Sequence, residues 1–218
     1  MKMTILTATA VVLAASWALA QQDRTEAHVM LMLSEPGPRR IMKEVEFSKQ
    51  AHPGPDKTLA LLIEASRPCR AVVAAFNKEG LLAYDGQAIN ILVKENHTNR
   101  IPPVEAPKWT WDGHEKLSEI NVILLAENSP DAGDLSRFVD AMRDSGLSDA
   151  VRKRQAGSLH RWIDAHSQSS SAASDYTLKS GPVLIGGTVR GEGCDWCKSA
   201  KPVSIPGGGS VVIRIRLE

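Results

Sequence analysis

Two cysteines near the C-terminus, Cys194 and Cys197, are the residues with the clearest capacity for chemistry, because they form a C-x-x-C pair. Such a pair can close a disulfide, ligate a metal, attach haem or exchange thiols. A thioredoxin-like redox pair needs its first cysteine at a helix N-terminus, where the helix dipole stabilises the thiolate. Glycine-rich sequence surrounds this pair and Pro202 follows it, which leaves little room for such a helix.

Haem and zinc are further alternatives for the same pair. Covalent c-type haem uses C-x-x-C-H, whereas Lys198 follows Cys197 here; some haem enzymes use a lysine at this position as the iron ligand. A zinc site needs four ligands, so Cys69 and a histidine would have to complete it. The histidines available are His28, His52, His97, His114, His160 and His166.

We predict a structural disulfide between Cys194 and Cys197, which an oxidising compartment permits. With three cysteines, one remains unpaired or bonds elsewhere. A bridge from Cys69 to Cys194 or Cys197 is the alternative pairing. Such a bridge would close a loop of more than about one hundred residues and would stabilise the fold by about 4 to 5 kcal/mol. A redox pair, a zinc or haem site and free thiols remain open as alternatives.

His160, Asp164 and His166 form a second polar group on a predicted helix. His160 and Asp164 are spaced i, i+4 and so share one face, which is typical of a surface ion pair. His166 lies towards the C-terminus of that helix, where the dipole favours positive charge. A metal site would need a further clear ligand. We therefore predict no metal site and no cofactor, with Cys194, Cys197, His160 and His166 as minor candidates for a metal or haem.

Trp109 and Trp111 alternate, so their side chains point the same way if the segment is extended. An exposed aromatic pair could bind a glycan or a protein, and core packing is the equal alternative. The chain contains no G-x-S-x-G elbow, no H-E-x-x-H and no P-loop. We therefore predict no catalytic residues, and a binding protein in preference to an enzyme.

The first twenty residues have the order of a cleavable signal peptide. Lys2 supplies a positive start, residues 3–17 are uncharged and largely apolar, and Ala18-Leu19-Ala20 is a small-x-small cleavage site. A retained transmembrane helix is the alternative, but the apolar run is shorter than the roughly 20 residues that a bilayer needs. We therefore expect a secreted or periplasmic protein that begins near Gln21 and has no other membrane span.

Cleavage would leave 198 of the 218 residues, enough for one domain with its own core. The mature chain would lose only Lys2 from its charges, leaving 25 basic and 25 acidic residues and a net charge of zero. Nucleic-acid binding depends on clustered lysine and arginine that neutralise phosphates. The charge balance thus argues against a nucleic-acid partner and leaves an envelope protein or a glycan.

Short runs of alternating apolar and polar residues, broken by glycine and proline turns, predict strands in the first part of the chain. The predicted strands are residues 29–33, 41–47, 58–64, 70–76, 81–84, 89–93 and 120–126. Asn77-Lys78-Glu79-Gly80 is expected to join two of them as a hairpin turn. This number of short strands at such spacing predicts a β-sandwich.

The period then changes to that of helices. Ser129 is a good N-cap, and an apolar face precedes Gly146, made of Leu135, Phe138, Val139 and Met142. Ser148 can cap a second helix with an apolar stripe at Leu159, Trp162 and Ile163, although Gly157 weakens its middle. A serine-rich stretch over 167–174 is expected to be a linker. The chain then returns to strands at residues 183–189, 201–205 and 210–217.

Residues 57–129 resemble the bacterial family of exported β-sandwich proteins catalogued as domain of unknown function 4384. The resemblance rests on the strand 59–64 with the turn Ser66-Arg67-Pro68-Cys69, the strand 72–76 with its hairpin turn, and the strand ending Leu124-Leu125-Ala126. Residues 91–96 stand where that family has a Phe-Pro-Asn segment. The resemblance implies an immunoglobulin-like fold and an envelope setting, and no catalytic residues.

The chain is thus expected to be mainly β, an immunoglobulin-like β-sandwich with a two-helix insertion and C-terminal strands. Its predicted parts are a signal peptide (1–20), a sandwich (21–128), a helical hairpin (129–166), a linker (167–174) and C-terminal strands that complete the sandwich (175–218). The expected function is that of an exported, non-catalytic binding or scaffold module of the bacterial envelope. A redox, metal or haem protein using Cys194 and Cys197 is the alternative.

Overall fold

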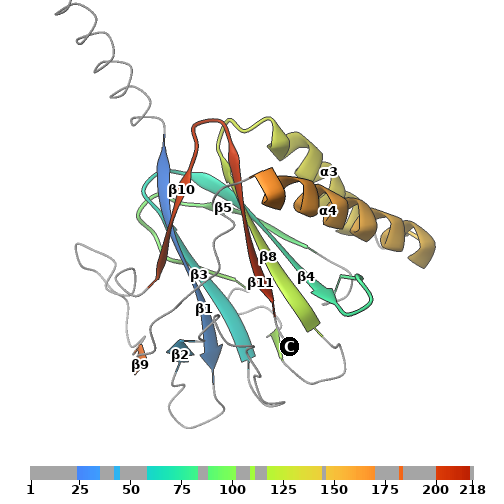
Figure 1. Ribbon diagram of the computed structural model, residues 1–218, viewed down its shortest axis with the longest axis horizontal. Helices are drawn as coiled ribbons and strands as arrows, with labels where there is room; N and C mark the ends of the chain where they lie inside the picture. The colour runs from blue at the N-terminus through green and yellow to red at the C-terminus, as the bar shows by residue number, and fades with distance from the viewer. Residues whose placement is uncertain are drawn as a thin grey trace, which may run out of the picture.

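Strands make up most of the described part of the chain, which is therefore mainly β as predicted. The computed structural model describes residues 24–34, 42–44, 58–82, 88–101, 109–110, 117–143, 146–169, 182–183 and 200–216. The strands form two antiparallel sheets, and two helices accompany them (Figure 1). The predicted signal peptide, Cys194, Cys197 and Trp111 lie outside the described residues.

The first sheet is built around β1, which has β3 along one side over eight residue pairs. On its other side, β10 pairs with the first half of β1 and β2 with the second half. The strands of this sheet are β1 (Thr25–Ser34), β2 (Met42–Glu44), β3 (Thr58–Ala65), β6 (Asn99–Ile101), β7 (Trp109–Thr110), β9 (Pro182–Val183) and β10 (Lys201–Ile205).

The second sheet has the order β11-β8-β4-β5. Its strands are β4 (Cys69–Asn77), β5 (Ile89–Val93), β8 (Leu117–Ala126) and β11 (Ser210–Arg216). The last two strands of the chain are thus divided between the sheets, since β10 pairs with β1 and β11 pairs with β8. A short turn joins them, so the C-terminal strands tie the two sheets together.

Alternate side chains of β4 and β8 enter two different cores, because successive strand residues face opposite ways. Ala71 and Val73 join the apolar cluster between the two sheets, which also contains Leu61 of β3. Val72 and Phe76 join a second cluster on the opposite face of the sheet. Burial on both faces explains why these strands read as nearly unbroken apolar runs.

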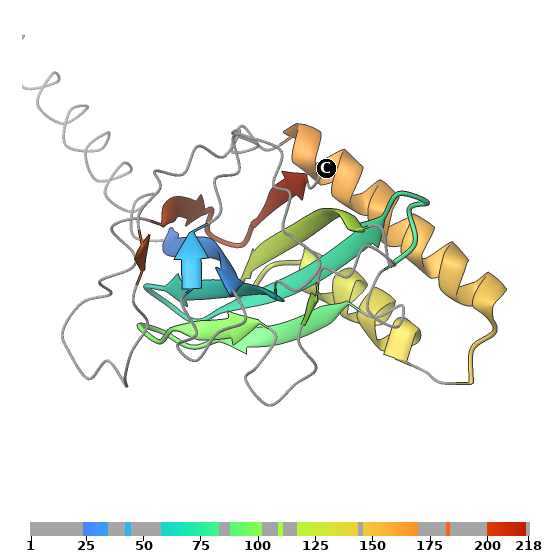
Figure 2. The same ribbon diagram turned by 90° about the horizontal axis from the view of Figure 1, so that it is seen from below.

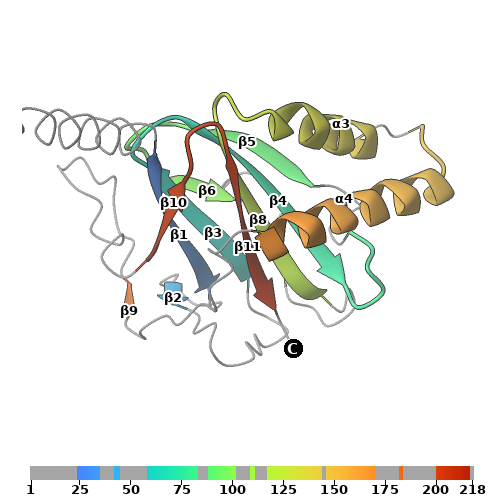
Figure 3. The ribbon, with the colours of Figure 1, turned by 45° about the horizontal axis from the view of Figure 1, so that its top comes forward.

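The two helices α3 (Asp131–Arg143) and α4 (Asp149–Ser169) cover that second face (Figures 2 and 3). The Ser129 hydroxyl accepts a hydrogen bond from the Asp131 amide (3.3 Å), which confirms the predicted N-cap of α3. Each helix contributes its predicted apolar stripe to the second cluster. The fully or almost fully buried helix residues there are Leu135, Val139, Met142, Ala156, Leu159 and Ile163.

The hairpin turn after β4 is also confirmed. The Asn77 side-chain oxygen accepts hydrogen bonds from the amides of Glu79 and Leu81, both at 3.0 Å. Gly80 has a φ of 73°, a left-handed conformation that glycine adopts without steric cost. In the predicted strand 81–84, the described residues form only a bridge from Leu82 to Phe76.

Several elements differ from the prediction: β1 begins at Thr25 rather than at residue 29, and β8 begins at Leu117 rather than at residue 120. Helix α4 continues to Ser169, three residues into the predicted linker, and the Ser167 hydroxyl donates a hydrogen bond to the Ile163 carbonyl there (2.6 Å). Strands β6 and β7 fall where a loop was expected; they are too short to show a period in sequence.

Among the described residues, no helix combines the length and hydropathy needed to cross a bilayer.

Candidate functional site

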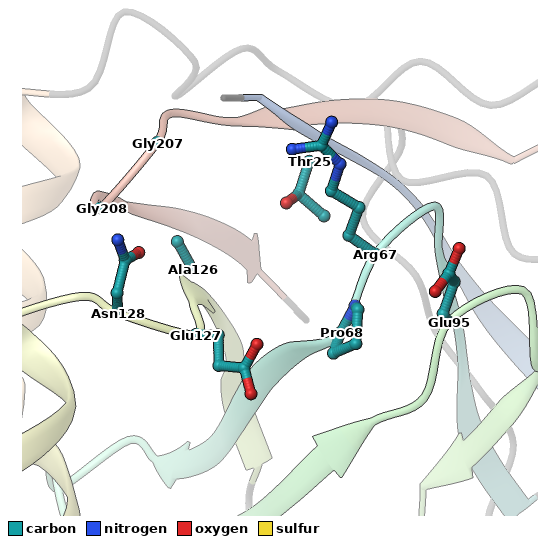
Figure 4. A pocket seen from close by; sticks show the side chains of 9 residues that line it. All are labelled: Thr25, Arg67, Pro68, Glu95, Ala126, Glu127, Asn128, Gly207 and Gly208. Atoms are coloured by element: carbon teal, nitrogen blue, oxygen red, sulfur yellow. The ribbon is translucent and has the colours of Figure 1, made fainter. Parts of the chain in front are cut away.

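A pocket of about 790 Å³ lies at the end of the sheets where β4 begins and β8 ends (Figure 4). Most of its lining comes from the connections β3–β4, β5–β6, β8–α3 and β10–β11. The lining residues are Thr25, Arg67, Pro68, Glu95, Ala126, Glu127, Asn128, Gly207 and Gly208. Segments far apart in the chain therefore meet at one site.

Backbone hydrogen bonds fix the turns that form the pocket. The Gly209 amide donates to the Pro206 carbonyl (2.9 Å), and Gly208 has a φ of 67°, as the third position of a type II turn requires. The Ala126 amide donates to the Gly209 carbonyl (3.0 Å), which joins this turn to the end of β8. These bonds hold two walls of the pocket against each other.

The opposite wall is anchored to β1 and β3. The Ser66 amide donates to the Glu26 carbonyl (2.8 Å), and the Glu26 amide donates to the Ser66 hydroxyl (3.0 Å). The Asn96 amide donates to the Ala65 carbonyl (2.8 Å), which positions the neighbouring Glu95. The pocket is thus formed by loops attached to a hydrogen-bonded scaffold.

The charged side chains of the pocket are exposed and differ in sign. Figure 4 shows Arg67 and Glu95 on one side, and Glu127 and Asn128 on the other. Within the described residues, the side chains of Arg67, Glu127 and Asn128 make no hydrogen bond or ion pair. Glu95 has one weak contact, to the Asn96 amide group at 3.4 Å. These groups remain available to a ligand.

A second polar cluster joins α4 to the outer face of the second sheet, and we call it the α4 clamp. His160 lies between two carboxylates: Nε2 is 3.3 Å from Glu119 and Nδ1 is 3.1 Å from Asp164. Arg214 donates to Asp164 at 2.5 Å, and its Nε is 4.0 Å from Glu119. Four side chains from α4, β8 and β11 thus alternate in charge whenever His160 is protonated.

The clamp is partly shielded from solvent. The Glu119 and Arg214 side chains are 14% and 22% exposed, and the Phe76 ring meets the His160 ring edge-on at 5.0 Å. Burial raises the pKa of Asp164, but the hydrogen bond from Arg214 and the charge of His160 outweigh it and hold that pKa below its usual value. The Asn121 amide, which is fully buried, donates to Glu119 at 2.9 Å.

The geometry of the clamp suits holding a helix better than binding a metal. Both nitrogens of His160 face carboxylates on different elements, while the His166 ring stacks on Trp162 at 3.7 Å and its Nδ1 lies 2.8 Å from the Trp162 carbonyl. In the part of the chain that the structure describes, no three His, Cys, Asp or Glu residues are grouped to hold a metal ion.

Cys69 is a fully buried free thiol at the start of β4. Burial raises its pKa to about 11, so the thiol stays protonated and unreactive near neutral pH. It faces the core between the sheets and is not bridged to another cysteine in this structure. The pairing of Cys194 with Cys197 stays a prediction, since neither lies in the described ranges.

The predicted aromatic pair is placed only in part. Trp109 belongs to β7, where its backbone is the register partner of Leu59 in β3. Trp111 is not among the described residues, so a shared face with Trp109 stays a prediction.

No family model, curated protein or solved structure matches this chain. The resemblance to the exported sandwich family therefore stays a prediction.

Sequence reasoning did not single out Glu119, Arg214 or Glu127 as functional residues. A signal for the first two was present, because Glu119 shares one face of a largely apolar strand with Ile123 and Leu125. Arg214 likewise shares a strand face with the buried Val212. A charged residue on a buried strand face needs a partner. No comparable local pattern marks Glu127, which lies in a turn.

Proposed function

We propose that this protein is an exported, non-catalytic binding module of the bacterial envelope, with an immunoglobulin-like β-sandwich as its scaffold. The observation that carries the proposal is the pocket at one end of the sheets, lined by four separate connections. Loops at the ends of a rigid sandwich are common places for binding sites, because they vary without disturbing the core.

The chemistry of the pocket supports recognition of a polar molecule. Its volume falls within the range of about 300–1,000 Å³ that is usual for small-molecule sites. Arg67 and Glu127 present charges that have no described partner, and Asn128 adds an amide that can donate and accept. Such groups orient a ligand and discriminate between ligands by their charge.

The binding function is tested by mapping small polar fragments onto the ¹⁵N-labelled protein by NMR. We expect hits to shift the amides of Glu127, Asn128 and Gly208, and Asn128→Trp, which adds bulk at the pocket wall, to abolish those shifts. Lys78→Trp is the matched control, since it adds the same ring at the exposed hairpin turn at the other end of β4. Fragment shifts that avoid the pocket, or that survive Asn128→Trp, would refute the proposed site.

Export is tested separately by mass spectrometry of the protein expressed from the full gene in a bacterium. We expect recovery from the periplasm or medium with Gln21 at the N-terminus, since Ala18-Leu19-Ala20 fits the cleavage site. An intact Met1 on cytoplasmic protein would contradict export. The same spectrum shows whether Cys194 and Cys197 have lost their thiol hydrogens to a disulfide or carry haem.

A further inference from the structure

The charges that line the pocket are unequal. Glu95 and Glu127 are acidic and Arg67 is basic, so the described lining carries a net charge of −1 at neutral pH. A ligand with the complementary charge pattern would place cationic groups at the carboxylates of Glu95 and Glu127 and an anionic group at the guanidinium of Arg67. Complementary charge patterns select the partner and its orientation.

Other charged residues of the described chain include both paired and unpaired ones, and Arg67 and Glu127 differ from them in lining one pocket. The half-buried Glu64 accepts a hydrogen bond from Thr98 (2.6 Å), and the exposed Asp134 pairs with Arg137 (2.6 Å). The side chains of Lys78 and Glu79, at the exposed hairpin turn, have no such partner among the described residues. Arg67 and Glu127 line one pocket without such partners. Charged groups of both signs in one concavity, left unpaired, are available to a ligand that carries both signs.

The turn at the upper wall adds backbone groups. Gly207 and Gly208 occupy the central positions of the type II turn and present no side chains beyond their Cα atoms. An ideal Cβ at Gly208 would lie 3.9 Å from the Asn128 side-chain oxygen. The backbone and the Asn128 amide therefore lie close together, where a polar ligand can reach both.

We infer that the pocket binds a basic amino acid, free or within a short peptide, with its ammonium groups at Glu95 and Glu127 and its carboxylate at Arg67. This inference rests on the proposed binding function and narrows it to one ligand class. Arg suits the carboxylate because its planar guanidinium can donate two parallel hydrogen bonds. The carboxylates accept from ammonium groups, which have three donors each.

The test uses isothermal titration of the full chain as expressed, at about 10 mM salt, where the Debye length is about 30 Å and charge contributions are largest. The probes are L-lysine, cadaverine, which lacks the carboxylate, L-norleucine, which lacks the side-chain ammonium, and the dipeptide Gly-Lys. We expect lysine to bind with a dissociation constant on the order of 1 mM, since exposed ion pairs are weak. Cadaverine and L-norleucine, which each lack one charged group of lysine, should each bind about fivefold more weakly than lysine.

Two variants separate the contacts. Arg67→Gln should weaken lysine binding about fivefold. It should not weaken cadaverine binding, because cadaverine has no carboxylate to lose and its two ammonium groups are no longer repelled by the arginine charge. Glu127→Gln should weaken both. Lys78→Gln and Glu79→Gln are the charge-matched controls at the hairpin turn, where both residues are exposed, and should change neither. Gly-Lys binding more tightly than lysine would indicate that the ligand is a peptide, and the reverse order that it is a free amino acid.

Two results would overturn the inference and leave pocket binding intact: cadaverine binding as tightly as lysine, or norleucine doing so. Equal effects of Arg67→Gln on lysine and cadaverine would overturn it as well. Absence of binding by all four probes would also refute the ligand class. The binding function is then judged by the fragment mapping, which does not depend on these probes.

Discussion

The α4 clamp should couple helix and sheet more strongly than a surface ion pair of the same chain. We compare Glu119 with His160, whose side chains are 14% and 34% exposed, and Asp134 with Arg137, which are 58% and 81% exposed. The perturbations are Glu119→Gln, His160→Gln and their combination. Asp134→Asn, Arg137→Gln and their combination provide the control.

The expected magnitude follows from distance and exposure. Opposite unit charges at the 3.3 Å that separates His160 Nε2 from Glu119 would attract by about 5 kcal/mol at an effective dielectric constant of about 20. Desolvation and the partial exposure of His160 reduce this to a coupling of about 1.5 kcal/mol, within the range of hydrogen bonds to charged groups. The exposed control pair should give about 0.3 kcal/mol.

The coupling free energies are measured by urea unfolding of each set of single and double variants at pH 5.5, where imidazole side chains are generally charged. Asp164 keeps its charge at this pH because its pKa in the folded protein is lowered. The stability that this charge contributes is present above the usual pKa of an aspartate, and it is lost only as the pH falls through the lowered pKa of the folded state. The coupling belongs to the protonated ring, since a neutral imidazole has one N–H and cannot donate to both Glu119 and Asp164.

The reasoning is refuted if the Glu119–His160 coupling does not exceed the Asp134–Arg137 coupling at pH 5.5. His160 and Asp164 would then be the surface pair that their spacing alone suggests.

Further outcomes test the packing and the backbone. Leu159→Ala, at a fully buried position between α4 and the sheet, should cost about 3 kcal/mol in urea unfolding, whereas Leu92→Ala, at a 54% exposed position, should cost less than about 0.5 kcal/mol. Gly80→Ala should destabilise by about 1 kcal/mol because its φ is 73°, while Gly133→Ala in α3, with open space around it, should stabilise by about 0.5 kcal/mol; equal effects in thermal melts would contradict this. Cys69 should resist thiol reagents until the protein unfolds. Because burial raises the pKa of the Cys69 thiol, the stability that its neutral form contributes is present below the usual pKa of a cysteine and is lost as the pH rises to about 11. This loss of stability at alkaline pH should be absent in Cys69→Ala.

Local sequence patterns predicted the strands and helices whose caps, turns or periodicity lie within a few residues. The strand Ile89–Val93 has the predicted bounds, and the caps at Ser129 and Ser148 begin the helices within a residue or two of the positions expected. Strands β6 and β7 were missed, because two or three residues show no period and are extended through pairing with β3.

The two candidate sites, by contrast, could not be predicted from local sequence patterns. The i, i+4 spacing of His160 and Asp164 was visible, but it indicated a surface pair. Glu119 and Arg214 join them through strand register and helix packing, which no local spacing records. The pocket likewise combines Arg67, Glu127 and Gly208 from three different connections.

The sequence by itself determined both helices and most of the longer strands, because alternation, helical period, caps and turns act over a few residues. It also predicted that the C-terminal strands return to the sheets. Tertiary structure alone decided that the second sheet is buried on both faces, that α4 lies on it through the clamp, and that four turns meet at one pocket. Those outcomes depend on contacts between residues far apart in the chain, and their partners are chosen by register and packing.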